Sequence, residues 1–299
     1  MKLRRIALPL LFLAACAPAQ PSPAPRQSAA KVAHPALWKL ADEDTTIYLF
    51  GTIHVLPKDY AWESPRLKQV VGQSDELVIE TVLGDDPTAM ATMLLTMGRA
   101  TGLPPLLDRV APAKRAALQS IITRSGLPPV LLDGLKTWTA GMMLVAVTLT
   151  DIGADAQSGV EQRLKTDFAS AGKPIEGLEK PEQQLGFLDS LSEADQRGFL
   201  ESVVDSPEAS RKDFARMLAA WSRGDDKAIS ATFDNEPEMT PKLRQVLLYG
   251  RNAGWAAWLK QRLDKPGTLL VAVGAGHLAG KNSVQDQLAA RGLKVTRVE

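Results

Sequence analysis

Residues 269–280 read LLVAVGAGHLAG, an apolar run that breaks at glycine and is followed by a histidine. A short, continuous apolar run between turn residues is typical of a strand buried on both faces, as in a parallel sheet. Residues 48–57, YLFGTIHVLP, show the same pattern of an apolar run, a glycine and a histidine. In both stretches the glycine stands three residues before the histidine. Two such strands, one near each end of the chain, predict that the two ends share one sheet.

Between these stretches the pattern is mostly helical. The α/β fold that we expect has a central, mostly parallel sheet built from the N- and C-terminal regions, with a large helical insertion at about 87–265. The elements predicted from the pattern are a hairpin (37–40 and 46–50), a helix (64–72), strands at 74–83, where Glu80 closes the apolar run, and at 173–179, a strand at 267–277, a helix at 283–292 and a last strand at 294–298. The order of strand, helix and strand over residues 46–80 predicts a parallel pair with a right-handed crossover.

The first 20 residues, MKLRRIALPLLFLAACAPAQ, have the order of a secretory signal: basic residues, a short apolar core and small residues. The sequence LAAC, which ends at Cys16, resembles the bacterial lipobox and predicts a signal peptide at 1–15 and lipidation of Cys16. Alanine rather than aspartate follows Cys16, which favours the outer membrane. Cleavage after Ala19 is the alternative, and it would leave a soluble periplasmic or secreted protein.

Residues 16–33 are rich in proline, alanine, serine and glutamine, which predicts a disordered tether. The folded domain is then expected at 34–299, with contact to the membrane only through the lipid anchor and with His34 in solvent. The apolar run at 141–153, GMMLVAVTLTDIG, is too short for a membrane span, and a buried helix is the better interpretation.

The composition excludes several classes of function. Thirty-five basic and 34 acidic residues give a net charge of +1, so nothing points to nucleic acid as a partner. Cys16 is the only cysteine, which rules out a disulfide within the chain. The sequence contains neither H-E-x-x-H nor G-x-S-x-G, so a helical zinc-protease site and a serine nucleophile at an elbow have no support.

Three candidate site residues fall at the ends of predicted strands: His54, Glu80 and His277. In open α/β sheets, sites form outside the carboxyl ends of the strands. Two imidazoles and a carboxylate are suitable ligands for Mn²⁺, Co²⁺, Zn²⁺ or Fe²⁺. A metal held in this way activates water and polarises a carbonyl group, which is what hydrolysis requires. Each histidine could instead bind a loop carbonyl and have no function.

Several segments together resemble the TraB/GumN family, which includes the Tiki proteases. They are LFGTIHVLP, SDELVIETVL, GKPIEGLEKPEQQL, LLYGRNAGWAAWL and the segment from residue 269 to residue 298. The resemblance implies a metal-dependent hydrolase, in the Tiki branch a peptidase that depends on Mn²⁺ or Co²⁺. It also implies that His54, His277 and Glu80 belong to the site, and it adds Arg251 and Asn252. Glu161 stands where relatives usually have aspartate, which leaves a direct ligand role there unsupported.

Two further residues have chemical arguments of their own. A helix from Pro241 would carry an apolar stripe with Arg251 beside its centre, and an inward arginine needs a carboxylate such as Glu80 or an anionic substrate. Asn252 would point about 100° away from Arg251, so only the resemblance supports it. Glu179 ends another strand and is a candidate ligand or partner of the metal site, or simply a carboxylate at a helix start. Gln183, on the helix that follows, is a weaker candidate.

The sequence therefore favours an enzyme, a metallohydrolase that acts on peptides or another small substrate of the cell envelope. A non-catalytic lipoprotein that captures haem or a metal with the same histidines is the alternative. A third interpretation, an inactive scaffold in polysaccharide export, follows only from the GumN relatives. Substrate, metal and oligomeric state are not encoded in any motif that we find.

Overall fold

The computed structural model describes residues 32–82, 84, 87–151, 153, 156–204, 207–234 and 239–299, and these residues contain a six-stranded sheet in the order β4-β3-β5-β2-β1-β6. The strands are β1 (Leu37–Ala41), β2 (Thr45–Thr52), β3 (Glu76–Thr81), β4 (Ile175–Glu179), β5 (Gly267–Gly274) and β6 (Val295–Arg297). Strands β4, β3, β5 and β2 are parallel to their neighbours, whereas β1 is antiparallel to both β2 and β6. The expected α/β fold is confirmed. The predicted signal peptide, Cys16 and nearly all of the predicted tether lie outside the described residues.

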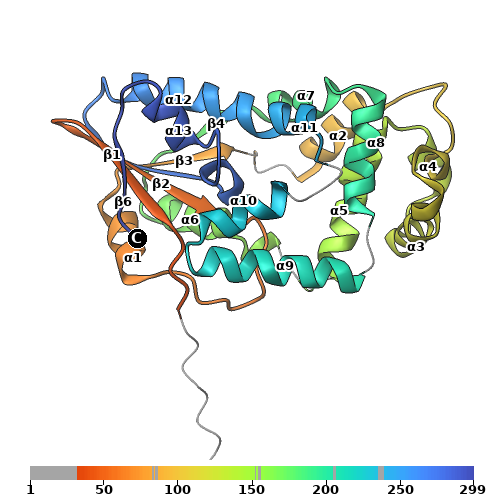
Figure 1. Ribbon diagram of the computed structural model, residues 1–299, viewed down its shortest axis with the longest axis horizontal. Helices are drawn as coiled ribbons and strands as arrows, with labels where there is room; N and C mark the ends of the chain where they lie inside the picture. Colours follow the sequence, from red (N-terminus) through yellow and green to blue (C-terminus); the bar gives the residue numbers. More distant parts are fainter. Residues whose placement is uncertain are drawn as a thin grey trace, which may run out of the picture. The chain divides into compact units, whose positions relative to one another are not determined.

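The helices complete the architecture (Figure 1). The α-helices are α1 (Pro65–Gln73), α2 (Pro87–Gly98), α3 (Arg115–Ser125), α4 (Pro129–Asp133), α5 (Thr137–Asp151), α6 (Val160–Ser170), α7 (Pro181–Asp189), α8 (Glu193–Val203), α9 (Pro207–Ser222), α10 (Asp226–Asp234), α11 (Pro241–Arg244), α12 (Gly250–Arg262) and α13 (Val284–Ala289). Short 3-10 turns are η1 (Leu106–Arg109), η2 (Pro112–Lys114), η3 (Ala156–Ser158) and η5 (Ala275–Leu278), and η4 (Gln245–Tyr249) is a π-helical turn.

Strand β5 occupies the centre of the sheet because its side chains are apolar on both faces. It pairs with β2 from Thr45↔Gly267 to Thr52↔Gly274, and with β3 on its other side. The prediction that β2 and β3 form an adjacent pair is wrong, since β5, from the other end of the chain, is inserted between them. The insertion puts the carboxyl ends of all three strands beside one another.

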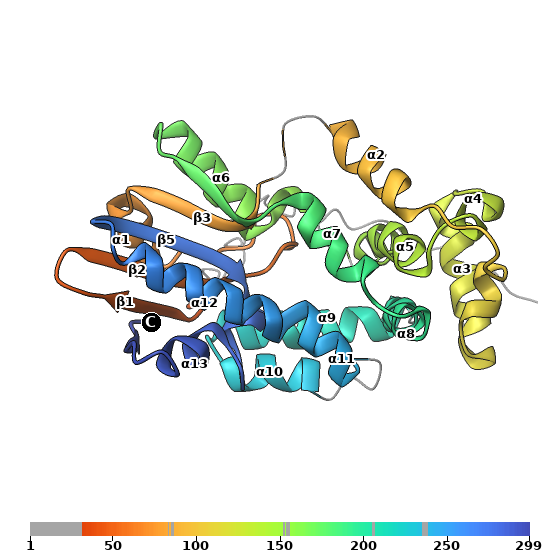
Figure 2. The same cartoon turned by 90° about the horizontal axis from the view of Figure 1, so that it is seen from above.

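Helices cover both faces of the sheet (Figure 2). On one face α12 and α13 pack against alternate residues of the strands through a cluster that includes Trp255, Leu259 and Leu288. On the other face α1, α6, α9 and α10 form a cluster that includes Val70, Phe168 and Trp221. The alternation of side chains along each strand assigns neighbouring residues to opposite faces.

The helical insertion has apolar clusters of its own, and it also contributes to the sheet. Helices α3, α5 and α8 share one cluster, and Trp138 of α5 packs with α7 and α11 in another. Strand β4 lies within the predicted insertion yet joins the sheet as an edge strand beside β3, so the sheet is not built from the chain ends alone. Within the described residues no helix is both long and apolar enough to cross a membrane.

The apolar stripe predicted on the helix from Pro241, Leu243, Leu247, Gly250, Gly254 and Trp258, is right in part: Leu243, Leu247 and Trp258 pack in apolar clusters, but the two glycines do not. The π-helical turn η4 separates α11 from α12, and its wider turn shifts the helical phase. Gly250 and Gly254, which the stripe placed inward, are exposed, while Asn252, Trp255, Ala256 and Leu259 are the buried residues of α12. Regular periodicity cannot predict this change, because it assumes a constant 3.6 residues per turn.

Candidate functional site

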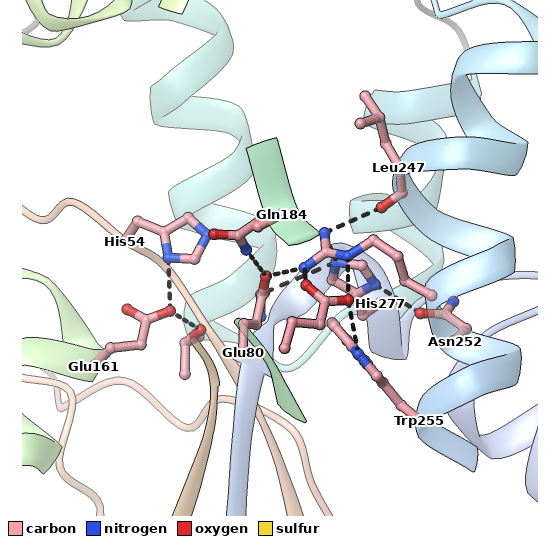
Figure 3. A network of polar contacts seen from close by, with 12 residues as sticks. His54, Glu80, Glu161, Gln184, Leu247, Asn252, Trp255 and His277 are labelled. Carbon is pink, nitrogen blue, oxygen red and sulfur yellow. Dashed lines mark hydrogen bonds and ion pairs between the residues drawn. The ribbon is translucent and has the colours of Figure 1, made fainter. Parts of the chain in front are cut away.

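The carboxyl ends of β2, β3 and β5 carry His54, Glu80 and the turn with His277, and all of them belong to one polar network (Figure 3). Gly274, the last residue of β5, lies at the centre of the three side chains. A Cβ atom at this position would lie 3.1 Å from Glu80 Oε1, 3.6 Å from His54 Nε2 and 3.7 Å from His277 Cδ2. Glycine is needed here because any side chain would take the space around which these groups converge.

His277 is buried in the 3-10 turn η5, and its neighbours define its tautomer. Asn252 Nδ2 donates to the carbonyl of Asn282 at 2.8 Å, which turns Asn252 Oδ1 toward the ring. His277 Nδ1 therefore donates its proton to Asn252 Oδ1 at 2.6 Å, and Nε2 keeps its lone pair. Burial, followed by the positive charges of Arg251 and His54, lowers the pKa of His277 to about 3 although Glu80 opposes the shift. The imidazole is thus neutral, as a metal ligand must be.

His54 is held in the same manner from the opposite side. Its Nδ1 lies 2.7 Å from Glu161 Oε1, and the Glu161 carboxylate also accepts a hydrogen bond from the Thr52 hydroxyl. The carboxylate of Glu161 raises the pKa of His54, whose side chain is 67% exposed, to about 9. With no metal bound, His54 is therefore protonated at neutral pH. Its Nδ1 faces Glu161, and Nε2 is the nitrogen on the side of Gly274.

Glu80 lies beside His277, with its Oε1 3.8 Å from His277 Nε2, and joins Arg251 to the sheet. Its Oε1 accepts the N–H of Gly274 at 2.8 Å, and its Oε2 accepts from Arg251 Nη2 at 2.6 Å and from Gln184 Nε2 at 3.2 Å. Burial on its own would raise the pKa of Glu80, but His277, Arg251 and His54 together with the Gly274 N–H outweigh burial and lower it to about 2. Glu80 is ionised over the whole physiological range.

Arg251 lies between two buried carboxylates. Its Nε and Nη2 donate to the two oxygens of Glu179, each at 2.8 Å, and Nη2 also donates to Glu80. Its Nη1 donates to the carbonyl of Leu247 and to His277 Nε2, each at 3.2 Å, so the five N–H donors of the guanidinium all have acceptors. The guanidinium also stacks 4.8 Å from the Trp255 ring, whose Nε1 donates to Glu179 at 2.9 Å. Both oxygens of Glu179 are therefore engaged by protein donors.

A pocket of about 310 Å³ opens beside this network and is lined by His54, Ile79, Glu80, Thr81, Glu161, Gln162, Lys165 and Gln184. Helix α6 supplies Glu161, Gln162 and Lys165, and α7 supplies Gln184. Arg251, Glu179 and His277 are not among the lining residues. The pocket thus opens onto His54 and Glu80, while Arg251 is not part of its lining.

The sequence analysis singled out most of the residues that the network contains: His54, Glu80, Glu179, Arg251, Asn252 and His277. Their roles in catalysis or metal binding stay predictions. Gln183 is exposed, and its neighbour Gln184 contacts Glu80 instead. Glu161 had been noted only as a departure from the family, and Thr81 and Lys165 carried no motif that could have identified them. His34 is exposed and pairs with Glu299 at 2.8 Å.

We asked whether these residues fit a divalent metal. Among the described residues no group of three His, Cys, Asp or Glu side chains has the spacing of a ready-made metal site. The chemistry of the donors nevertheless fits, because both imidazoles bind an acceptor through Nδ1 and keep Nε2 on the side of Glu80, which is the usual arrangement of histidine ligands. An ion at His277 Nε2 would require Arg251 Nη1 to give up this nitrogen, while Glu179 and Leu247 still hold the guanidinium.

Comparison with known proteins places this site in a family. The model of the TraB/PrgY/gumN family matches residues 36–297, which include every residue of the network. YbaP of Escherichia coli (strain K12) is 25% identical over 241 residues, which cover 81% of this chain and 87% of that protein, and YbaP of Shigella flexneri matches equally. Both relatives are described as uncharacterized. No solved structure matches this chain significantly.

Proposed function

Because this chain belongs to the TraB/PrgY/gumN family and gathers two imidazoles and a carboxylate beside one pocket, we propose that it is a metal-dependent hydrolase of peptide or amide bonds in the bacterial cell envelope. One observation carries the proposal. Each histidine binds an oxygen acceptor through Nδ1, Glu161 for His54 and Asn252 for His277, so that Nε2 of each ring is left for an ion beside Glu80.

In this proposal His54, His277 and Glu80 hold a divalent ion, with Mn²⁺ or Co²⁺ favoured by the family and Zn²⁺ or Fe²⁺ also suited to such donors. The ion would supply an activated water molecule and polarise the scissile carbonyl. Glu179 is satisfied by Arg251 and Trp255, so we assign it to holding the arginine rather than to the ion.

The other residues of the network act on charge and orientation. Arg251 compensates the charge of Glu80 and Glu179 in a place where two unpaired carboxylates would be costly. Gln184 holds one oxygen of Glu80 and the Gly274 N–H holds the other, which fixes the plane of the carboxylate. Glu161 lines the pocket and shares the Nδ1 proton of His54 in a hydrogen bond. It is therefore the group best placed to exchange protons with a substrate.

The alternative of a haem-binding lipoprotein fits the residue types of the pocket less well. Seven of the eight residues that line the pocket are polar, and only Ile79 is apolar. A haem ring requires an apolar slot with an axial ligand that faces it.

Location in the cell envelope follows from the lipobox at Cys16, which would attach the chain to a membrane through lipid alone. The outer membrane is the proposed destination.

Calorimetric titration of Mn²⁺, Co²⁺ and Zn²⁺ tests the proposal directly. We expect His54→Ala and His277→Ala each to weaken binding by more than about tenfold, because a ligand is lost. His34→Ala is the matched control, since His34 is exposed and lies outside the network, and it should bind metal as the wild type does. Binding should also weaken as the pH falls below about 9, because His54, whose pKa is raised to about 9, must lose a proton to bind an ion. Circular dichroism checks the fold of each variant.

Equal metal affinity in wild type, His54→Ala and His277→Ala would refute the metal site. The reaction is tested separately by incubating a mixture of peptides with the metal-loaded protein and analysing the products by mass spectrometry. Cleavage that stops in chelator and in His277→Ala supports a metallohydrolase. Tight metal binding without any cleavage would refute the hydrolase and leave a metal-binding protein.

A further inference from the structure

Lys165 is an unpaired cation in the wall of the site pocket. It lies one helical turn after Glu161 on α6, on the same side of the helix, and it is half-buried. Glu161 itself is occupied by His54 and Thr52. Within the described part of the chain, Lys165 has neither a hydrogen bond nor an ion pair, although His54, Glu80 and Glu161 in the same wall are all paired. Lys165 thus provides a positive charge that no group among the described residues uses.

Thr81 supplies a second unused group in the same wall. Its hydroxyl is buried, and within the described residues it has no hydrogen-bond partner. Glu80 and Thr81 are successive residues of β3, so their side chains project to opposite faces of the sheet. Glu80 turns toward Arg251 of α12, which places Thr81 on the face that α6 covers. A buried hydroxyl without a partner costs free energy, which a polar ligand in the pocket would recover.

We infer that Lys165 and Thr81 form a carboxylate-binding subsite, and that the substrate is a peptide whose free C-terminal carboxylate lies next to the scissile bond. The inference rests on the proposed function for the position of that bond, beside His54 and Glu80. It goes further by defining the substrate as one cleaved near its C-terminus.

The dimensions of the pocket agree with such a substrate. Four residues along a helix correspond to a rise of about 6 Å, so Lys165 is roughly this far along α6 from the residue that holds His54. Adjacent Cα atoms in a peptide are about 3.8 Å apart, so a carboxylate one or two residues beyond the scissile bond comes within reach of the lysine. A pocket of about 310 Å³ has room for a few residues rather than for a long segment of chain.

The test measures binding rather than turnover, so that it does not depend on the hydrolase. Acetyl-pentaalanine with a free carboxyl terminus, the same peptide as its C-terminal amide, and acetyl-Ala-Ala-Glu-Ala-Ala amide are titrated into chelator-treated protein and followed by NMR. We expect the free acid to bind at least about tenfold more tightly than the amide, as a charge-assisted hydrogen bond implies. The glutamate peptide distinguishes a terminal carboxylate from one on a side chain.

Variants assign the preference to the subsite. Lys165→Ala should abolish the advantage of the acid and Lys165→Arg should retain most of it, while Lys260→Ala, which removes an exposed lysine of α12 outside the pocket, should change nothing. Thr81→Val should reduce the advantage of the acid without lowering the melting temperature, because the hydroxyl bonds to none of the described residues in the free protein.

The inference is overturned if the free acid and the amide bind with equal affinity, or if neither shows binding up to millimolar concentration. It is also overturned if the preference for the acid survives in Lys165→Ala, or if only the glutamate peptide binds. A preference for the acid that depends on Lys165 supports the subsite even where no cleavage is found, so failure of the hydrolase and failure of the subsite are separate results.

Discussion

Replacing Arg251 with methionine tests whether the guanidinium holds the site together. Methionine keeps much of the volume and the apolar contact with Trp255 but removes the positive charge and all five donors. The side chains of Glu80 and Glu179 are only 9% and 2% exposed, so both carboxylates would be left in the protein interior without a cation. The variant is best studied after chelator treatment, so that no bound metal takes the place of the arginine.

Two independent routes give the magnitude. Breaking a buried ion pair by removing one partner costs about 3–5 kcal/mol. Against burial, His277, Arg251, His54 and the Gly274 N–H together lower the pKa of Glu80 from its ordinary 4.5 to about 2, a net shift of about 3 kcal/mol at 1.36 kcal/mol per pH unit, of which Arg251 supplies a part. An unfolding entropy of about 2.1 cal/mol/K per residue over the domain converts 3–5 kcal/mol into a melting temperature lower by roughly 5–9 °C.

The pH dependence gives a sharper readout than the melting temperature at one pH. In the wild type the pKa of Glu80 is lower in the folded than in the unfolded protein, so its ionised form stabilises the fold above about pH 4.5 and this stabilisation is lost as the pH falls toward 2. Without Arg251 the pKa of Glu80 should rise. The difference in unfolding free energy between wild type and variant should therefore be largest above pH 5 and should shrink as the pH is lowered.

Urea unfolding at several pH values measures this difference. Arg216→Met is the matched control, because Arg216 is exposed, pairs only with Asp213 in the described structure, and should cost at most about 1 kcal/mol. Adding Glu179→Gln to Arg251→Met should recover part of the lost stability by removing one unpaired charge. A variant within about 1 kcal/mol of the wild type at pH 7, with a parallel pH profile, would refute the view that Arg251 neutralises two buried carboxylates.

Three further predictions concern single residues. Asn252→Leu should leave His277 Nδ1 without an acceptor and weaken metal binding by roughly 10- to 100-fold. Asn252→Asp keeps an acceptor and should bind the metal more tightly than the leucine variant, and calorimetry compares the two affinities. In Glu161→Gln the pKa of His54 should fall from about 9 toward its ordinary 6.5, so that in the chelator-treated variant the imidazole loses its proton near neutral pH, which NMR titration of the ring detects. The wild-type ion pair stabilises the fold fully below pH 6.5 and ceases to do so as the pH rises through 9. Cys16→Ser should release the protein from membranes into the soluble periplasm, and unchanged membrane fractionation would contradict the lipid anchor.

Sequence reasoning was most successful where a residue is tied to the end of a strand. His54, Glu80 and the turn with His277 follow strands of apolar residues, and parallel strands put their carboxyl ends at one edge of the sheet. These residues could therefore be proposed as neighbours before any helix was placed. The hairpin of β1 and β2 and the start of α1 at its Ser64 cap followed from turn and capping residues alone.

Sequence reasoning failed where the position of a residue depends on how a helix meets the sheet. Asn252 was expected to point away from Arg251, yet the side chains of both residues contact the ring of His277. The π-helical turn before Gly250 shifted the phase of α12, so Gly250 and Gly254 of the expected stripe are exposed. No local pattern reports such a turn, since its cost is compensated by tertiary contacts.

The chain by itself thus determined which strands meet and which residues stand at their ends, because apolar runs and glycine breaks are local properties of the sequence. Only the tertiary structure decided that β5 lies between β2 and β3, and that Glu161 and Asn252 accept hydrogen bonds from Nδ1 of His54 and His277. It also decided that Lys165 and Thr81 line the same pocket. Such contacts join residues that are far apart in the sequence. Asn252 and His277 are 25 positions apart, and Thr52 and Glu161, which also contact each other, are 109 positions apart. Contacts over such separations depend on the packing of α6 and α12 against the sheet, which is determined by the complementary shapes of many side chains at once.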